Sequence, residues 1–394
     1  MKKIISILLI ITMIFSLAAC NKADVKDANS DNTQKPDVSS GDNSDKEKQE
    51  VDFDKLPVVN MAWGVDMHTG VIYAGCELTE VFKDRPAYLS KIADGKYALY
   101  IDGVPSAVIN HVPTKNSSES VNLFATGEID LAILSNTAVF TAYDINVDVQ
   151  ILSPIQSDGI ACVAINDAPF NNFEEMVEYA KNSEQPLKMG YHSSLSGPRI
   201  VIEKALIEAG LTITEDPADY TADVLTVDLK GLANLQPALI SKQVDAWVAP
   251  APQPELSASS GNGKLIGGLD SFSKDGKWAN FPCCTYAASS KIINSSPEIV
   301  QAITQVIYDT TNYVQENKEA AAKAICSNIG IEEEVFNNSY IIYNTAPTQE
   351  WQNGIGLYYD AMVQMRKFEG RLASEKFENA KEKVFNFTFI NNVK

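Results

Sequence analysis

Hydrophobic positions in the body of the chain form two alternating patterns. Short apolar runs at 58–63 and 187–191 predict buried strands. Apolar residues spaced by three or four positions at 71–82 and 198–209 predict the helices that follow them. Strands that alternate with helices form mainly parallel sheets with both faces covered. The pattern therefore predicts an α/β fold.

A second pattern occurs twice. Residues 126–133 (TGEIDLAI) and 241–248 (SKQVDAWV) each follow the expected end of a helix. Each contains a short turn, a β-branched residue, an aspartate and then an apolar strand. A polar or proline-containing loop follows each strand. The chain thus contains two similar α/β units, near 58–155 and 185–255. Ligands of such sheets bind beyond the carboxyl ends of the strands, so two units facing each other predict a cleft.

Other segments complete the expected organisation. Helical spacing continues at 297–314, 316–325 and 348–368. The segment 85–104 predicts a hairpin around Asp102-Gly103.

The N-terminus has the pattern of a secretory signal. Lys2 and Lys3 precede a short apolar stretch at 4–17, and Ala18-Ala19-Cys20 follows it. The string Leu-Ala-Ala-Cys resembles a bacterial lipobox, which implies cleavage before Cys20 and a lipid on that cysteine. The alternative is an ordinary signal, with Cys20 incidental. The polar residues that follow, up to position 56, predict a flexible tether.

Composition excludes some classes of protein. The 394-residue chain has 45% apolar and 21% charged residues, which is typical of a globular protein. Its net charge of -19 argues against a nucleic-acid partner. Six cysteines are too few for a disulfide scaffold in a chain of this length. No apolar run long enough to span a membrane occurs beyond the first twenty residues.

The candidate binding residues lie in the loops at the strand ends. Helix N-termini together with hydroxyl and amide groups can hold a small anion without a cation. Aromatic side chains can form flat apolar walls for an organic solute. The alternative for single serines is a helix N-cap. The expected ligand-binding residues are Trp63, His68, Thr69, Asn116, Ser117, Ser135, Asn136, Thr137, Asp158, Tyr191, His192, Ser193, Ser194 and Trp247.

Three further features leave alternatives open. Arg199 can pair with an anionic ligand, or it can be a solvated or salt-bridged helix residue. The three histidines, His68, His111 and His192, have no HxxxH or HxH spacing, so we expect neutral hydrogen-bonding roles and no metal. Cys283-Cys284 lies in a predicted strand, where neighbouring side chains point to opposite faces. One of the pair can therefore face the cleft, or both can be small buried residues.

Enzymatic signatures are missing from the sequence. It contains no GxSxG, no HExxH and no P-loop, so we expect neither an enzyme nor a cofactor. Any ATP hydrolysis coupled to this chain then belongs to a partner.

The order of these motifs resembles the substrate-binding lipoproteins of ABC importers, above all the branch that binds nitrate, sulfonates and thiamine precursors. The motifs are the lipobox, the tether, TGEIDLAIL, GYHSSLSGPR, SKQVDAWVAP and the helix beginning SSPEIVQ. The resemblance implies a two-lobe type II periplasmic-binding-protein fold. The implied parts are a signal peptide (1–19), a lipidated tether (20–56), lobe 1 (58–155), lobe 2 (156–280) and a return to lobe 1 (281–394).

The same resemblance implies a function. A monomeric, membrane-anchored extracytoplasmic protein would capture a small anionic or polar organic solute and deliver it to an ABC permease and its ATPase. The alternatives are a sensory binding protein on the cell surface and an α/β enzyme.

Overall fold

The computed structural model describes residues 51–394. The expected signal peptide, the lipidated Cys20 and most of the expected tether lie outside the described residues. The last part of that tether contains a short 3₁₀ helix, η1 (Phe53–Lys55). Among residues 51–394, no helix combines the length and the apolar character needed to cross a membrane.

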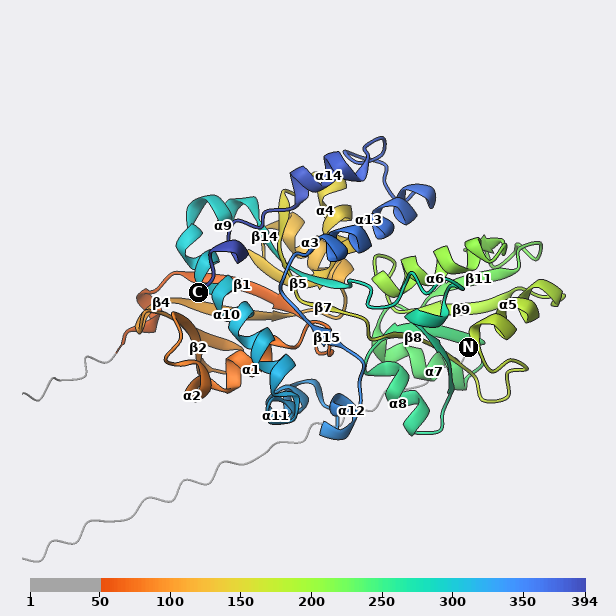
Figure 1. Cartoon of the computed structure of the whole chain (residues 1–394), viewed down its shortest axis with the longest axis horizontal. Coiled ribbons are helices and arrows are strands. Elements are labelled where there is room, and N and C mark those ends of the chain that lie inside the picture. Colours follow the sequence, from red (N-terminus) through yellow and green to blue (C-terminus); the bar gives the residue numbers. More distant parts are fainter. Residues whose placement is uncertain (1–50) are drawn as a thin grey trace, which may run out of the picture. The chain divides into compact units, whose positions relative to one another are not determined.

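Seven strands form the first sheet, in the order β2-β3-β4-β1-β5-β14-β6 (Figure 1). β1 is parallel to β4 and β5, whereas β14 is antiparallel to β5 and β6. The late strand β14 lies between two early strands, so the chain returns to this sheet after building the second. The strands are β1 (Val58–Trp63), β2 (Ala87–Ala93), β3 (Lys96–Ile101), β4 (Val104–Pro113), β5 (Leu131–Ser135), β6 (Val149–Pro154) and β14 (Cys284–Ser289).

Six strands form the second sheet, in the order β10-β11-β9-β12-β8-β13. The four strands β10, β11, β9 and β12 are parallel, and β8 is antiparallel to both of its neighbours. A two-stranded ribbon pairs β7 (Gln156–Ser157) with β15 (Ile342–Tyr343). The strands of the second sheet are β8 (Ile160–Ala164), β9 (Leu187–Tyr191), β10 (Ile213–Thr214), β11 (Val224–Asp228), β12 (Ala246–Pro250) and β13 (Lys264–Gly268).

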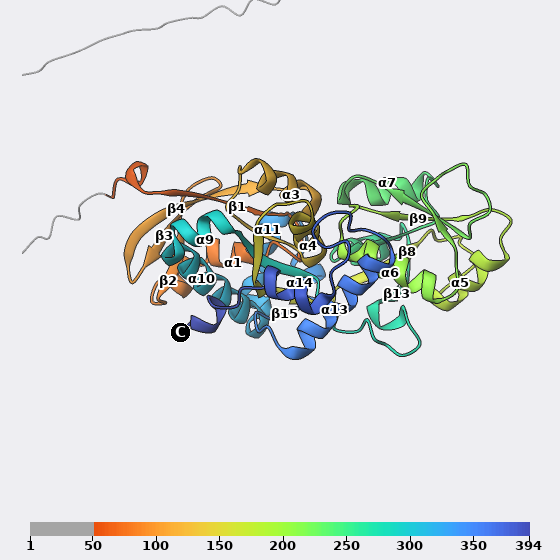
Figure 2. The same cartoon turned by 90° about the horizontal axis from the view of Figure 1, so that it is seen from above.

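We call the parts built around the seven-stranded and six-stranded sheets lobe 1 and lobe 2. The two lobes lie side by side in both cartoon views (Figures 1 and 2). The α/β class with parallel-rich sheets, expected from the sequence, is confirmed.

Helices cover both sheets. Helix α13 of the C-terminal segment packs against α6, which belongs to lobe 2. The α-helices are α1 (Ile72–Glu77), α2 (Thr79–Phe82), α3 (Ser117–Thr126), α4 (Asn136–Asp144), α5 (Phe173–Asn182), α6 (Gly197–Glu208), α7 (Leu235–Ile240), α8 (Gln253–Ser259), α9 (Ser290–Ser295), α10 (Pro297–Glu316), α11 (Lys318–Ile329), α12 (Glu333–Asn337), α13 (Gln349–Gln364) and α14 (Phe377–Val384). The 3₁₀ helices are η2 (Leu232–Asn234), η3 (Leu269–Ser271) and η4 (Ile390–Asn392).

One local prediction is confirmed by this fold and another is corrected. The predicted hairpin is confirmed: β3 and β4 pair across Asp102 and Gly103, whose φ angles are 48° and 77°. Two-residue hairpin loops favour such positive angles, which glycine and aspartate tolerate. The helix expected over 71–82 is instead broken into α1 and α2, because Leu78 has φ -100° and ψ 46°.

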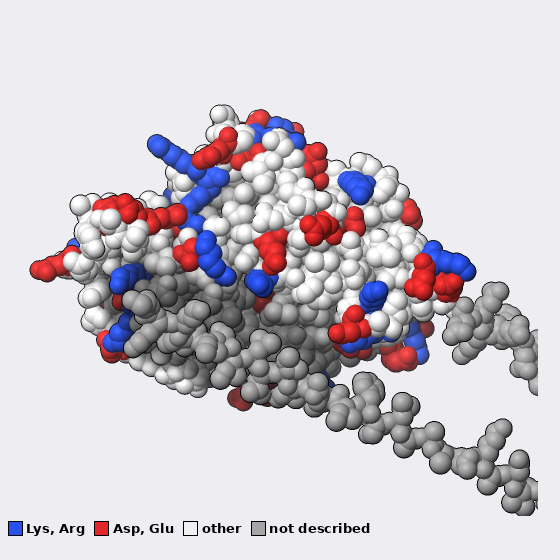
Figure 3. Space-filling model, turned by 180° about the vertical axis from the view of Figure 1, so that it is seen from behind, with Lys and Arg blue, Asp and Glu red and all other residues white. Residues whose placement is uncertain are grey.

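Charged side chains of both signs are interspersed on the face shown in Figure 3, where the described residues are visible. No large patch of a single sign is seen on that visible surface. The visible part of this face therefore lacks the clustered cations that a phosphate backbone requires.

Candidate functional site

A cavity of about 40 Å³ is lined by residues of both lobes. Since one water needs about 10–15 Å³, the cavity has room for a few waters or a small ion. Its walls come from the loops after β1, β4 and β9, from the ends of β5 and β12, from the start of β14 and from helix N-termini. The lining residues include Gly64, Asp66, His68, Thr69, Thr114, Asn116, Ser117, Ser135, His192, Ser196, Gly197, Pro250, Cys283 and Cys284.

Three helices begin at this cavity. They are α3, preceded by Asn116, α4, preceded by Ser135, and α6, preceded by Ser196. The side chains of Asn116 and Ser196 accept hydrogen bonds from backbone N–H groups of their own first turns, as N-caps do. The positive ends of three helix dipoles therefore face one small space, which favours negative charge there.

His68 is held rigidly in the loop after β1. The carboxylate of Asp66 accepts hydrogen bonds from the backbone N–H groups of His68 and Thr69, at 2.8 and 2.9 Å. The His68 Nε2 lies 3.0 Å from the carbonyl oxygen of Gly159, so Nε2 carries the proton and donates it. Nδ1 then has a free lone pair, which accepts a hydrogen bond from the side-chain amide of Gln156.

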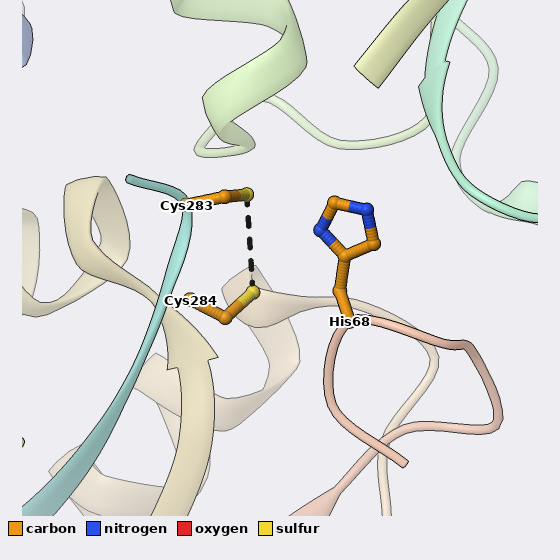
Figure 4. A group of neighbouring side chains, drawn as sticks. All are labelled: His68, Cys283 and Cys284. Carbon is orange, nitrogen blue, oxygen red and sulfur yellow. Dashed lines mark hydrogen bonds between the residues drawn. The ribbon is translucent and has the colours of Figure 1, made fainter. Parts of the chain in front are cut away.

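Cys283 and Cys284 present both sulfur atoms to His68 (Figure 4). The two Sγ atoms are 3.9 Å apart, both thiols are buried, and both residues line the cavity. The expectation that neighbouring strand residues point to opposite faces is wrong for this pair. The physical reason is that β14 begins only at Cys284, so Cys283 does not follow the strand alternation.

The start of β14 is fixed by Asn136, whose side-chain amide and backbone N–H donate to the carbonyl oxygen of Cys283 at 2.7 and 3.0 Å. A hydrogen bond from the Cys284 thiol lowers the pKa of Cys283 below its ordinary value, although burial alone would raise it. The same hydrogen bond and burial raise the pKa of Cys284. Burial lowers the pKa of His68, but the neighbouring Cys283, the charge of Asp66 and the hydrogen bond to Gly159 together outweigh it, and the net pKa is raised.

His192 forms part of the wall that lobe 2 contributes. Its Nδ1 is buried and has no hydrogen-bond partner among the described residues. Burial, with a smaller contribution from the charge of His68, lowers the pKa of His192 to about 4. His192 is therefore a neutral group with a free polar atom at the cavity.

Of the residues predicted from the sequence, six line the cavity. They are His68, Thr69, Asn116, Ser117, Ser135 and His192. Asn136 supports the site indirectly, as described above. Thr137, beside it, donates to the carbonyl oxygen of Leu195, which joins α4 of lobe 1 to the loop after β9. Ser193 likewise contacts Ser118 of lobe 1, with 2.9 Å between the two hydroxyl oxygens.

The remaining predicted residues are placed elsewhere. Trp63 is fully buried in the lobe 1 core and stacks on His111, with 3.7 Å between ring centroids. Trp247 is buried in an apolar cluster of lobe 2. The carboxylate of Asp158 accepts a hydrogen bond from the backbone N–H of Gly159. The ring of Tyr191 packs under the guanidinium of Arg199. The backbone carbonyl oxygen of Ser194 accepts a hydrogen bond from the same guanidinium.

Arg199 is engaged by acidic residues. Its Nε is 2.6 Å from a carboxylate oxygen of Glu203, and its Nη2 contacts Glu215. Only 3% of Arg199 is exposed. Of the two sequence-based alternatives, the structure favours the ion-paired helix residue, because the guanidinium has no free edge toward the cavity.

The grouping of His68 with the two cysteines was missed at the level of sequence. Both features stood out there, the histidine in a loop after a strand and the vicinal cysteine pair, but they are far apart along the chain. Only the insertion of β14 beside β5 brings them together.

Comparison with known proteins completes the description of the site. A model of the NMT1-like family matches residues 94–330, which is more than half of the chain. The chain belongs to the NMT1-like family. No curated protein matches this NMT1-like chain by sequence.

Solved structures share its fold. The ligand-binding component of an ABC-type import system from Staphylococcus aureus, with zinc bound, has a TM-score of 0.66 and 11% identity, and the match covers 86% of this chain and 99% of that one. The nitrate-binding protein NrtA from Synechocystis has a TM-score of 0.62 and 12% identity, with coverages of 86% and 88%. The alkanesulfonate-binding protein SsuA from Xanthomonas axonopodis, bound to MOPS, has a TM-score of 0.59 and 12% identity, with coverages of 80% and 96%.

At these identities the likeness shows the fold. The expected periplasmic-binding-protein fold and the resemblance to the nitrate- and sulfonate-binding branch are thereby confirmed for this NMT1-like chain.

Proposed function

We propose that this NMT1-like protein is an extracytoplasmic solute-binding lipoprotein of an ABC importer. It captures a small anionic or polar organic solute between the two lobes, whose separation widens the small cavity described above, and delivers it to a membrane permease. Its structural neighbours include a nitrate-binding protein and a sulfonate-binding protein bound to MOPS, which supports an anionic solute. The proposed role is transport, without a catalysed reaction.

One observation carries this proposal: the cavity is enclosed by both lobes and faces the N-termini of α3, α4 and α6. A site with walls from two lobes opens when the lobes separate and closes when they approach. The chain crosses between the sheets from β6 to β8 and again from β13 to β14. Such paired crossovers are suitable hinges for lobe closure around a solute.

Native mass spectrometry of the purified protein tests this proposal without a guess at the ligand. We expect a stoichiometric mass excess over the denatured chain, because a solute enclosed by two lobes dissociates slowly. If the bare mass is found, a thermal-shift panel of sulfonates, carboxylates, nitrate and pyrimidines follows. A true ligand at about 100 times its dissociation constant adds about 2.7 kcal/mol of stability. Failure of the whole panel would contradict the proposed function.

The lipid anchor has its own test. Replacement of Cys20 by alanine is expected to move the protein from the membrane fraction to the soluble fraction, because the acceptor thiol of the lipid is lost. Cell fractionation followed by immunoblotting measures the distribution. Cys76→Ala, which removes a buried thiol, is the matched control and should leave the protein in the membrane fraction. Membrane retention of the Cys20→Ala variant would exclude lipidation at this residue.

A further inference from the structure

The cavity contains a cluster of side chains that the proposed solute binding does not explain. One ring nitrogen of His68 and the Sγ atoms of Cys283 and Cys284 all lie within 4.8 Å of one another, and all three residues are buried (Figure 4). The 3.9 Å between the sulfur atoms excludes a disulfide in this structure, since bonded sulfurs lie about 2.05 Å apart. The same separation is close to the roughly 3.8 Å between two thiolates at about 2.3 Å from a tetrahedral zinc ion.

The histidine is oriented as a metal ligand. Its Nε2–H donates to the carbonyl oxygen of Gly159, so the lone pair of Nδ1 is directed away from that bond and toward the sulfur atoms (Figure 4). Histidines that bind metals usually donate their other ring N–H to a carbonyl or carboxylate in this manner. The amide of Gln156 shares the Nδ1 lone pair and must turn aside when a metal binds.

The surroundings also favour two thiolates around a cation. The N-termini of α3, α4 and α6 stabilise negative charge at the cavity, and helix N-termini promote thiolate formation. Two buried thiolates without a cation would be costly, whereas a divalent cation neutralises both. Two polar atoms near the cluster, Gln156 Oε1 and His192 Nδ1, are buried without partners among the described residues. Such atoms point to an occupant that is polar.

We propose that Cys283, Cys284 and Nδ1 of His68 bind one thiophilic metal ion of the Zn²⁺ type at the wall of the cavity. Thiolate and imidazole ligands select such ions over Mg²⁺ or Ca²⁺, which prefer oxygen. Three protein ligands leave a fourth position open toward the cavity, as in metal sites that exchange a water or a small ligand. The inference goes beyond the proposed function, because it holds whichever organic solute the protein carries.

The position of the ligands predicts how the ion behaves during lobe motion. His68 follows β1, and both cysteines lie at the start of β14, so all three belong to lobe 1. The ion therefore stays bound to lobe 1 when the lobes separate. Lobe 2 contributes His192 to the lining of the same cavity and shields the ion when the lobes are closed.

A zinc titration of the full-length protein tests the site. The protein is kept reduced, freed of metal, and titrated with Zn²⁺ in competition with a chromophoric chelator. We expect one high-affinity equivalent per chain. Removal of a direct ligand in Cys283→Ala, Cys284→Ala or His68→Ala should weaken binding more than about 100-fold, since even outer partners of metal sites contribute about 10–100-fold.

The matched control is Cys162→Ala, which removes a buried thiol from β8 of lobe 2 and should leave the affinity unchanged. Thermal unfolding of each metal-free variant shows whether it is folded. The unmodified protein gives an independent readout with Co²⁺: thiolate-to-cobalt charge transfer together with the visible bands of tetrahedral cobalt is expected.

The outcomes separate this inference from the proposed function. The absence of a high-affinity equivalent, or binding that survives loss of either cysteine, overturns the metal site and leaves solute transport untouched. A cobalt spectrum without thiolate charge transfer overturns it equally. Conversely, zinc binding with the expected variant pattern stands even if no solute from the panel binds.

Discussion

Replacement of Arg199 by methionine is expected to destabilise the protein by about 3 kcal/mol. The side chain of Glu203 is only 5% exposed, and it loses a guanidinium partner at 2.6 Å. Breaking a buried ion pair by removing one partner typically costs about 3–5 kcal/mol, because the other charge stays buried. We expect the lower end of that range, since Lys367 still lies 3.7 Å from Glu203. Calorimetric unfolding of the variant and its parent measures the effect.

Two further variants make this prediction sharper. Arg199→Met combined with Glu203→Leu should recover most of the lost stability, because apolar residues can replace a buried ion pair at little cost. Lys242→Met breaks an ion pair with Asp167 in which both side chains are 66% exposed, and should change stability by about 1 kcal/mol or less. A single Arg199→Met variant as stable as its parent would show that the buried pair does not stabilise α6.

Replacement of Asp144 by alanine is the second change with a large expected effect, roughly 3 kcal/mol of destabilisation. The Asp144 carboxylate is buried and accepts hydrogen bonds from the backbone N–H groups of Glu369, Gly370 and Leu372, at 2.7–3.1 Å. Alanine leaves these three donors without an acceptor. The N–H of Leu372 is fully buried, and a buried unpaired group costs about 1–3 kcal/mol, whereas Glu369 and Gly370 are exposed and add less. Asp144→Asn should fall between the parent and the alanine variant, since one oxygen acceptor remains.

The neighbouring Asp148 provides the control. It pairs with Arg371 of the same segment at 2.6 Å, but its side chain is 62% exposed. Asp148→Ala should therefore cost no more than about 1 kcal/mol. Limited proteolysis adds a local readout: residues 366–376 should become sensitive in the Asp144→Ala variant. Equal thermal midpoints for the two alanine variants would contradict this role of Asp144.

Much of the architecture could be predicted from local sequence signals. The apolar runs of β1 and β9 and the helical spacing of α6 and α10 lie where the pattern placed them. Such signals work because burial of a strand or of a helix face is encoded by neighbouring positions. Helix α1 ended early for a reason the pattern does not contain, since the non-helical backbone of Leu78 interrupts an otherwise suitable spacing.

The residues that line the cavity were harder to predict than the helices and strands. Loops at strand ends were correctly expected to meet, and the cavity is lined by His68, Ser117 and His192 among others. The tryptophans Trp63 and Trp247 were expected as walls of a site, but both are buried in the cores of their lobes. An aromatic ring at a strand end fits either the core of a lobe or the wall of a binding site. The local sequence does not distinguish these two environments.

Asp144 illustrates the same limit. A carboxylate in the last turn of a helix is repelled by the negative end of the helix dipole. The local sequence therefore gives no reason for an aspartate at position 144. The reason is its contact with backbone groups more than 200 residues later, in the loop before α14.

The sequence by itself determined the class of the fold, the two repeated α/β units and the position of the strand-end loops. These depend on the periodicity of apolar residues and on turn chemistry, which act over a few neighbouring positions. Tertiary structure alone decided that the Arg199–Glu203 pair of α6 is buried and that His68 lies beside Cys283 and Cys284. The first outcome depends on what packs over α6. The second depends on the insertion of β14 beside β5 and on Cys283, which precedes β14 and does not follow the strand alternation. Packing between segments far apart along the chain has no signature in the local sequence.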